Sequence, residues 1–332
     1  MDEAPSEPRP SAQGPARRPD RWLVFGGVAI ALVHPLATVL DRRLWIADLI
    51  CHFQEPALVA TCLAALLAIA LKRPRIALGL VALAMFQTIP LVRYSGANPV
   101  RPDPSSNARL RILLSNILYE NETYEDLEHL IRVEKPDIVA LVEFAPGWSD
   151  ELASIRAEYP YRVEHPTGAS GLALWFKEEP IMIGTPEWLV QDSHPVVHAR
   201  FVFAGKPREL WLVHPRSPLS YKRFLKPGNA ELDAIAARVK ETGGSTIVIG
   251  DLNCTDGSAH FGDLLATTGL RDSRLGFGRQ GSWPTDQFYR IAIDHVFVSR
   301  DIAVCGRRLG EMVGSDHFPV IVDLAPAAPE TN

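Results

Sequence analysis

Three long apolar runs lie close together near the N-terminus of the chain and contain almost no charged residues. They cover residues 22–40, 56–71 and 76–92. A helix needs roughly 20 mostly apolar residues to cross a bilayer, and the apolar residues 49–51 could lengthen the second run. Three buried core helices are the alternative, and a cleaved signal peptide does not fit three successive runs. We therefore predict a membrane anchor of three transmembrane helices over residues 22–92.

Positive charges around these runs predict the side of the membrane on which the rest of the chain lies. Seven Lys and Arg residues lie in the N-terminal segment and in the loop between the second and third runs, against four in the first loop and just after the third run. Because positive charge favours the cytoplasmic side, everything after residue 92 is expected outside the cytoplasm. Residues 1–21, rich in Pro, Ser, Ala and charge, are expected to be a disordered tail.

From residue 109 to residue 326 the pattern changes to short apolar runs separated by turn-forming residues. A turn-rich linker over residues 93–108 precedes this domain, and residues 327–332 form a short tail. Strands outnumber helices, and several neighbours are joined too closely for a crossover helix, so we predict packed mixed sheets with helices outside. The expected strands cover residues 110–117, 137–144, 171–177, 196–203, 209–213, 246–250, 291–299 and 319–324, and the expected helices cover 124–134, 230–241 and 261–268.

Charge and cysteine content limit the classes of function. The whole chain has a net charge of −5, but residues 101–332 carry 24 Lys and Arg against 32 Asp and Glu, a net charge of −8. An acidic domain is a poor bulk binder of polyanions. The four cysteines show no C-x-x-C spacing, so neither a zinc site nor a disulfide framework is expected. A basic cluster between residues 206 and 226 is either a solvated loop or a guide for an anionic substrate or lipid headgroup, through Arg216, Lys222 and Arg223.

Polar side chains end several predicted strands, where a buried strand would not otherwise carry them. In residues 246–256, apolar residues and a glycine precede Asp251 and Asn253, which share one side of the strand because side chains two positions apart point the same way. Each residue alone also fits a turn or a helix cap. Ionised groups at the ends of buried strands cost free energy unless they are paired or bind a metal, so the set predicts a shared pocket. The other strand-end residues are Asn116, Glu143, His214, Asp294, Asp316 and His317.

These residue types suit metal-assisted hydrolysis of a phosphate ester. A hard divalent cation such as Mg²⁺ or Mn²⁺ prefers oxygen ligands and needs only one or two carboxylates, of which Glu143 is the best candidate. Asp251 would orient or deprotonate the attacking water, and Asp294 would orient His317 and favour its charged form. Neutral amides and protonated imidazoles would hold the phosphoryl oxygens. The chain offers Asn116, Asn253, His214 and His317 for that purpose.

Five other histidines of the domain are expected to be structural. His295 follows Asp294 directly, so strand alternation turns it to the opposite face. The other four, which belong to no strand-end motif, are His165, His194, His198 and His260.

In order, spacing and strand context, the strand-end motifs resemble the endonuclease/exonuclease/phosphatase superfamily. This superfamily includes pancreatic-type DNases, abasic-site endonucleases, bacterial sphingomyelinases and inositol-polyphosphate phosphatases. The resemblance covers about residues 108–325 and implies an α/β four-layer sandwich of two packed mixed β-sheets flanked by helices. The three apolar runs resemble the N-terminal anchors of some bacterial members, which implies a multi-pass protein of the bacterial inner membrane. The motifs are Leu-Ser-Asn116, Leu-Val-Glu143, Val-His214-Pro, Gly-Asp251-Leu-Asn253, Ile-Asp294-His-Val and Ser-Asp316-His317.

The resemblance also implies which residues bind the cofactor, Mg²⁺ or Mn²⁺. Glu143 would bind the metal, Asn116 would support it and Asp316 would lie near it. Asn116 would also lie close to the substrate phosphate. The sequence indicates no protein partner.

The resemblance assigns catalytic roles to the other strand-end residues. Asp251 would activate water, Asn253 and His214 would contact the scissile phosphate, and Asp294 would pair with His317. The predicted function is hydrolysis of a phosphoester by metal-activated water, nuclease-like or phospholipase- and sphingomyelinase-like, with nucleic acid or a phospholipid headgroup as the substrate. The alternative is a catalytically inactive membrane-anchored protein that retains the fold for binding.

Overall fold

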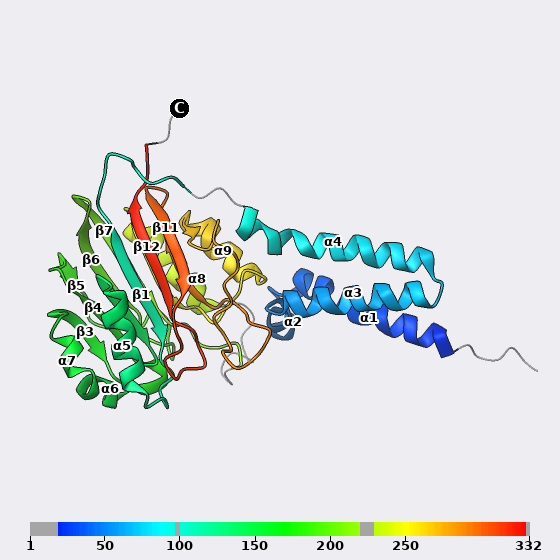
Figure 1. Ribbon diagram of the computed structural model, residues 1–332, viewed down its shortest axis with the longest axis horizontal. Helices are drawn as coiled ribbons and strands as arrows, with labels where there is room; N and C mark the ends of the chain where they lie inside the picture. The colour runs from blue at the N-terminus through cyan, green and yellow to red at the C-terminus, as the bar shows by residue number, and fades with distance from the viewer. Residues whose placement is uncertain (1–18, 97–99, 220–228, 330–332) are drawn as a thin grey trace, which may run out of the picture.

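The computed structural model describes residues 19–96, 100–219 and 229–329. The predicted disordered tail, residues 1–21, lies outside this part apart from its last three residues, and so do Lys222 and Arg223 of the basic cluster. Figure 1 shows a β-rich domain with a bundle of helices projecting from one side of it. Both parts contribute to the candidate site.

The projecting bundle contains the apolar runs predicted from the sequence. Two of its helices, α1 and α4, are each long and apolar enough to cross a membrane, whereas α2 and α3 meet the same test together as a pair bent by 78°. The described residues therefore hold two candidate spans, or three if the bent pair counts as one. The helices are α1 (Pro19–Leu40), α2 (Trp45–Cys51), α3 (Gln54–Ala70) and α4 (Pro74–Gly96).

The bend between α2 and α3 has a local cause in the sequence. Pro56 lies in the first turn of α3, where its missing N–H costs little, but within a helix continuing from α2 it would remove a hydrogen bond and clash with the preceding turn. Accordingly, α2 ends at Cys51 and α3 begins at Gln54. The short helix α2 lies at the base of the bundle, beside the β-rich domain (Figure 1).

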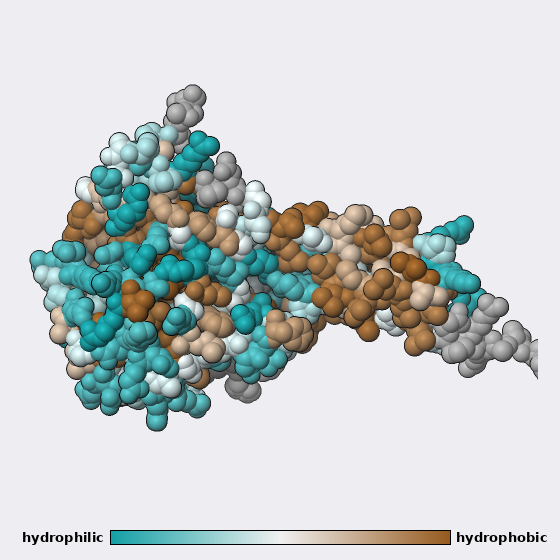
Figure 2. All heavy atoms as spheres, in the orientation of Figure 1, coloured by the Kyte–Doolittle hydropathy of each residue, from teal (hydrophilic) through white to brown (hydrophobic). Residues whose placement is uncertain are grey.

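Small side chains pack the bundle together, and large apolar side chains cover its outside. The buried contacts include Ala31, Ala64 and Ala68, while Leu63 and Leu78 are 61% and 72% exposed. Figure 2 shows apolar surface along the bundle, next to a largely hydrophilic domain. Lipid solvates large apolar side chains and small residues let helices approach closely, so this distribution is the one expected of helices in a bilayer.

The β-rich domain contains two six-stranded mixed sheets. In the described residues, pairing is parallel between β1 and β2 and between β7 and β8, and antiparallel between the other neighbours. One sheet has the order β11 (Ile302–Leu309), β12 (Val320–Pro326), β1 (Leu110–Asn116), β2 (Ile138–Val142), β4 (Leu172–Phe176) and β3 (Tyr161–His165). The other has the order β5 (Met182–Ile183), β6 (Val197–Phe203), β7 (Lys206–Val213), β8 (Thr246–Asp251), β10 (Asp294–Val298) and β9 (Arg271–Asp272).

The two sheets pack face to face, and helices cover both outer faces. Because side chains alternate along a strand, Ile112 and Leu114 of β1 meet Ile247 of β8 in the core between the sheets. On the outer faces, Leu113 packs with residues of α5 and Val248 with residues of α8 and α9. This arrangement confirms the predicted four-layer sandwich. The covering helices are α5 (Tyr124–Glu134), α6 (Pro146–Glu151) and α7 (Ala153–Arg156) on one face and α8 (Ala230–Thr242) and α9 (Ala259–Thr268) on the other.

The sequence did not predict strands β3 and β11, because neither has a regular pattern of buried and exposed positions. Strand β3 is an edge strand whose residues are mostly half-buried, so it lacks a clear apolar face. Strand β11 has a register irregularity between Val304 and Gly306, which interrupts the alternation that marks a strand. The predicted strand over residues 291–299 is shorter in the structure and begins at Asp294.

Strand register brings the predicted polar residues to one end of the packed sheets. Parallel pairing of β1 with β2 places Asn116 beside Val142, directly before Glu143. Antiparallel pairing of β8 with β10 places Asp251 opposite Asp294. The site therefore follows from how the sheets are paired.

Candidate active site

The end of β8 has a backbone shape that aims Asp251 and Asn253 into the site. A Cβ atom on Gly250 would lie 1.7 Å from the carbonyl oxygen of Val213, so only glycine allows β7 and β8 to approach this closely. Asn253 adopts a left-handed backbone with φ of 49°, which asparagine tolerates better than most residues. Its N–H donates to Asp251 Oδ1 at 2.8 Å, and its side-chain amide donates to the carbonyl of Pro215 at 3.1 Å.

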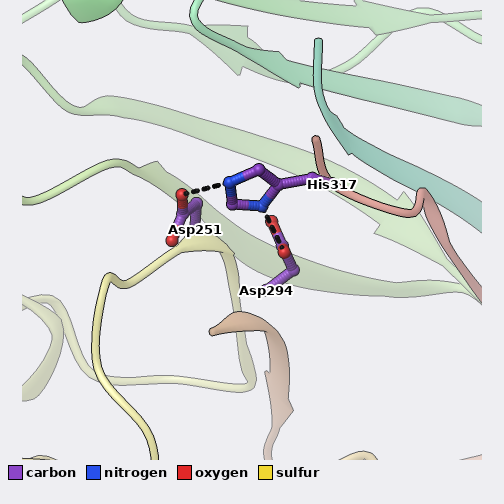
Figure 3. A group of neighbouring side chains, drawn as sticks. All are labelled: Asp251, Asp294 and His317. Carbon is purple, nitrogen blue, oxygen red and sulfur yellow. Dashed lines mark hydrogen bonds and ion pairs between the residues drawn. The ribbon is translucent and has the colours of Figure 1, made fainter. Parts of the chain in front are cut away.

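His317 lies between two carboxylates (Figure 3). Its Nδ1 is 2.8 Å from Asp294 Oδ2, and its Nε2 is 3.8 Å from Asp251 Oδ2. Burial disfavours the charged ring, but the carboxylate of Asp294, with Asp251 and Asp316, outweighs burial and raises the pKa of His317 to about 10. Burial and the neighbouring Asp294 raise the pKa of Asp251 to about 7. The site therefore pairs an imidazolium with a carboxyl group whose pKa suits a general base at neutral pH.

Asn116 connects the metal-ligand candidate to this pair. Its Nδ2 donates to Glu143 Oε1 at 2.9 Å and to Asp251 Oδ2 at 3.1 Å, and lies 3.4 Å from His317 Nε2. Glu143 has φ of 60°, a conformation that costs a bulky residue roughly 1–3 kcal/mol and persists where the surroundings enforce it. Its second oxygen accepts the backbone N–H of Tyr119 at 3.3 Å.

The segment before β12 presents Asp316 beside His317. Asp316 Oδ2 accepts a hydrogen bond from Trp283 Nε1 at 2.9 Å, and Asp316 Oδ1 lies 3.9 Å from His317 Nε2. Ser315 donates through Oγ to the carbonyl of Asn116 at 2.8 Å and accepts the backbone N–H of His317 at 3.1 Å. This serine therefore ties the His317 segment to the end of β1.

His214 enters the site from the end of β7. Its Nε2 lies 3.8 Å from Asp251 Oδ2, and its Nδ1 is buried without a hydrogen-bond partner among the described residues. Burial, followed by the nearby His194 and His317, lowers the pKa of His214 well below its ordinary value. A protonated ring was expected at this position, whereas burial favours a neutral imidazole that can donate one N–H to a phosphate oxygen.

His194 is one of two histidines that line the site although the sequence did not assign them to it; the other is His52. Its ring packs against that of His214 with centroids 5.0 Å apart, and its Nδ1 lies 3.0 Å from the carbonyl of His214. Burial lowers the pKa of His194 to about 4. No strand-end pattern surrounds this residue, so the sequence offered no signal for it. His295, as expected, turns away from the site and bonds to the carbonyl of Cys254.

The predicted residues surround one cavity of about 500 Å³. Asn116 and Asp294 are buried directly behind this cavity through their bonds to Glu143 and His317. The cavity also has apolar walls that the sequence did not predict. The predicted residues that line it are Glu143, His214, Arg216, Asp251, Asn253, Asp316 and His317, and the additional ones include Leu49, His52, Phe53, His194, Trp283 and Ile291.

Two groups of side chains could hold a metal ion. Asp251, Asp294 and His317 offer ligand atoms within 4.8 Å of one another, and Asp294 Oδ1 is buried without a hydrogen-bond partner among the described residues. A histidine ligand must be neutral, however, and the bond to Asp294 favours the charged ring of His317. Glu143 and Asp316 offer hard carboxylate oxygens to the same cavity, which is the donor type that Mg²⁺ and Mn²⁺ prefer. The donor types therefore favour Glu143 and Asp316 as the groups that would hold a divalent cation.

A four-layer sandwich with carboxylates and histidines at one end of its sheets fits phosphoester hydrolysis in general. Residues 113–317 match the model of the Endonuclease/Exonuclease/phosphatase family, which is more than half of the chain. The chain therefore belongs to this family, whose members are generally phosphodiesterases or other hydrolases and use divalent metals.

Solved structures share the fold at low sequence identity. TDP2 of D. rerio in complex with a single-strand DNA product is 17% identical, with a TM-score of 0.55, over 66% of this chain and 99% of that chain. A family protein from Bacteroides thetaiotaomicron is 17% identical, with a TM-score of 0.53, over 68% of this chain and 98% of that chain. A family protein from Leptotrichia buccalis is 15% identical, with a TM-score of 0.52, over 64% of this chain and 98% of that chain. A search of curated proteins found no match.

Proposed function

We propose that the chain is a membrane-anchored phosphoesterase that requires Mg²⁺ or Mn²⁺ and cleaves a phosphodiester by attack of water. The observation that carries this proposal is the convergence on one cavity of an imidazolium, a carboxyl group of raised pKa and a separate carboxylate that Asn116 links to both. A bound divalent cation would neutralise phosphate oxygens and favour ionisation of water.

Each protein group then has a defined task in the reaction. Asp251, with its raised pKa, accepts a proton from the attacking water. The water oxygen bonds to phosphorus, the bond from phosphorus to the leaving oxygen breaks, and the leaving alcohol takes up a proton, so a diester yields an alcohol and a phosphomonoester. His317 and neutral His214 donate to phosphate oxygens as charge develops on them, and Asn253 supports the same oxygens. Asp294 keeps His317 charged and oriented.

Glu143 and Asp316 are the proposed metal ligands. Asn116 donates to Glu143 and thereby directs one of its oxygens, leaving the carboxylate facing the cavity. Outer hydrogen bonds of this kind orient metal ligands and tune their affinity.

The arrangement of the bundle supports a location outside the cytoplasm for the catalytic domain. The start of α1 and the short connection between α3 and α4 both lie at the end of the bundle that is far from the domain (Figure 1). Arg21, Lys72, Arg73 and Arg75 flank that far end. Positive charge favours the cytoplasmic side, so the domain would lie on the opposite side.

The test is hydrolysis of bis(p-nitrophenyl) phosphate by the full chain in detergent micelles. We expect turnover with Mg²⁺ or Mn²⁺ that a chelator abolishes and fresh metal restores. Asp251→Asn should reduce kcat about a hundredfold or more, the usual range for loss of a general base, while Glu143→Gln should raise the metal concentration needed for half-maximal rate. Absence of metal-dependent turnover of any phosphoester by a folded chain would favour the alternative of an inactive binding protein.

A further inference from the structure

The cavity above the catalytic residues has one wall that comes from the helix bundle. Leu49 of α2 and Phe53 in the break between α2 and α3 line it, together with His52. His317 and Asp251 line the same cavity from the β-rich domain. The proposed membrane anchor is thus part of the site itself.

Polar contacts hold this wall against the catalytic loop. The backbone N–H of Thr255, two residues beyond Asn253, donates to His52 Nδ1 at 3.3 Å, and Thr255 Oγ1 lies 3.1 Å from the same nitrogen. Ser258 Oγ donates to Asp48 Oδ1 at 2.5 Å in a buried contact. Because hydrogen bonds are directional, the bundle has one position relative to the loop that follows the catalytic aspartate.

A further contact joins α2 to the segment after β7, which also lines the cavity. Trp45 Nε1 donates to the carbonyl of Pro218 at 2.5 Å, and Pro218 and the exposed Leu219 line the cavity. The residues contributed by α2 and by the segment after β7 therefore form a continuous rim. Arg216, in the same segment, adds a cation to the lining.

The lining combines polar and apolar side chains. The polar ones include the proposed phosphate-binding and metal-binding groups. The apolar side chains, which come from the bundle and the domain, are Leu49, Phe53, Leu219, Ile291 and Ile293. A sugar or nucleotide next to the scissile phosphate would lose hydration against these side chains without gaining hydrogen bonds, whereas an alkyl chain gains from leaving water.

The position of the rim relative to the bundle matches a membrane surface. If α3 crosses the bilayer, the 78° bend lays α2 nearly along the surface. Ile46 of α2 is 50% exposed, and Phe288, in the loop between the cavity residues Trp283 and Ile291, is 96% exposed. Exposed aromatic and aliphatic side chains of this kind are favoured at the level of lipid headgroups.

We propose that the substrate is a phospholipid of the membrane that holds the anchor. Its phosphate reaches His317 and Asp251, while the first part of its hydrocarbon lies against Leu49 and Phe53 and the rest stays in the bilayer. This inference rests on the proposed phosphoesterase activity and names its substrate class. The observation that carries it is one cavity lined both by the catalytic groups and by apolar side chains, of which Leu49 and Phe53 come from the bundle.

The test compares substrates that differ only in their hydrocarbon. The full chain in mixed micelles with Mg²⁺ is offered phosphatidylglycerol, phosphatidylethanolamine and sphingomyelin, the chain-free headgroup esters of each, a single-stranded DNA oligonucleotide and bis(p-nitrophenyl) phosphate. Burial of three or four methylene groups corresponds to about a hundredfold in affinity. We therefore expect kcat/KM for at least one lipid to exceed that for its chain-free ester by about a hundredfold.

Variants of the apolar wall test whether the bundle produces this preference. Leu49→Ala and Phe53→Ala should each lower the ratio of kcat/KM for the lipid to that for bis(p-nitrophenyl) phosphate by about tenfold, and Phe53→Leu should keep most of it. Leu63→Ala, an equal truncation at an exposed position on α3 away from the cavity, should leave both rates unchanged. Circular dichroism of each variant shows whether it folds.

Three results would overturn the inference. The first is equal kcat/KM for each lipid and its chain-free ester. The second is a wall variant that folds and keeps the full lipid preference, and the third is faster cleavage of single-stranded DNA than of any lipid. Each of these leaves metal-dependent hydrolysis of the soluble diester intact, so they differ from failure of the proposed function, in which the soluble diester is not cleaved either.

Discussion

Replacing Arg274 by Met should destabilise the protein by about 3–5 kcal/mol, the usual cost of removing one partner from a buried ion pair. Arg274 is fully buried and donates to Asp272 Oδ2 at 2.6 Å and to the hydroxyl of Tyr94 in α4 at 2.9 Å. Its guanidinium lies 4.2 Å from the centroid of the Tyr94 ring and 3.4 Å from Asp256 Oδ1. Without Arg274, the buried carboxylate of Asp272 loses the cation that pairs with it, whereas Asp256 keeps Arg279 at 3.5 Å.

The same cluster predicts that the protein loses stability in acid. Burial alone would raise the pKa of Asp272, but Arg274 outweighs burial and lowers it from 3.8 to about 2. A shift of this size corresponds to about 2 kcal/mol. Because the folded pKa lies below the unfolded one, this contribution is complete above about pH 4 and is lost as the pH falls towards 2. The Arg274→Met variant should lack this part of the acid sensitivity.

Thermal unfolding of the full chain in detergent, followed by near-ultraviolet circular dichroism, measures these effects. Arg274→Met should lower Tm by at least about 6 °C. Tyr94→Phe removes one hydrogen bond to a charged group and leaves no charge unpaired, so it should cost about 1.5–3 kcal/mol. Arg300→Met, at an exposed position, is the matched control and should change the free energy of unfolding by less than about 0.5 kcal/mol. An Arg274→Met variant as stable as the Arg300→Met variant would refute the reasoning.

Three further predictions concern the site directly. Gly250→Ala would place a Cβ 1.7 Å from the carbonyl oxygen of Val213 and should prevent folding or abolish activity. Its control is Gly262→Ala, at a helical position with open space around it, which should stabilise the fold by up to about 1 kcal/mol. Unfolding curves of both variants measure the difference. Asp294→Asn should keep the fold but lower kcat at least about a hundredfold, because His317 loses the carboxylate that orients it; normal turnover would contradict that role. Removing divalent metal should abolish turnover without unfolding the domain, as measured by circular dichroism alongside the assay.

The strands that build the site could be predicted because their patterns are local. Residues 246–250 form a continuous buried run, and the structure has β8 there with every residue buried. An alternating or continuous apolar pattern reports burial of a strand whatever it pairs with. Strand β11 could not be predicted, because the register irregularity after Val304 arises from pairing with β12, which no local pattern records.

The sequence predicts that the polar residues converge on one site only when all of them are considered together. Strand alternation predicted that Asp251 and Asn253 share one side, but β8 ends at Asp251 and Asn253 has a left-handed backbone. The contact of Asp251 with Asn116, 135 positions before it, depends on how the two sheets pack. The polar residues at several strand ends indicated this packing indirectly, because ionised groups without a partner cost free energy at the ends of buried strands. His194 lies in a loop with no such type pattern, so its place against His214 needed the structure.

The sequence predicts the membrane anchor, but it does not predict that the helix bundle forms a wall of the site. Hydropathy identifies α3 by its apolar residues, yet the docking depends on the polar residues that interrupt the apolar runs. Arg42 contacts Asp263 at 2.7 and 3.0 Å, and Glu55 contacts Arg279 at 2.5 Å. Each of these solvent-accessible ion pairs is worth little alone, but together with the buried contacts of α2 they hold the bundle against the domain. A flexible tether would leave the cavity open on that side, whereas the docked bundle closes it and leaves an apolar rim at the level where the bilayer surface is proposed to lie.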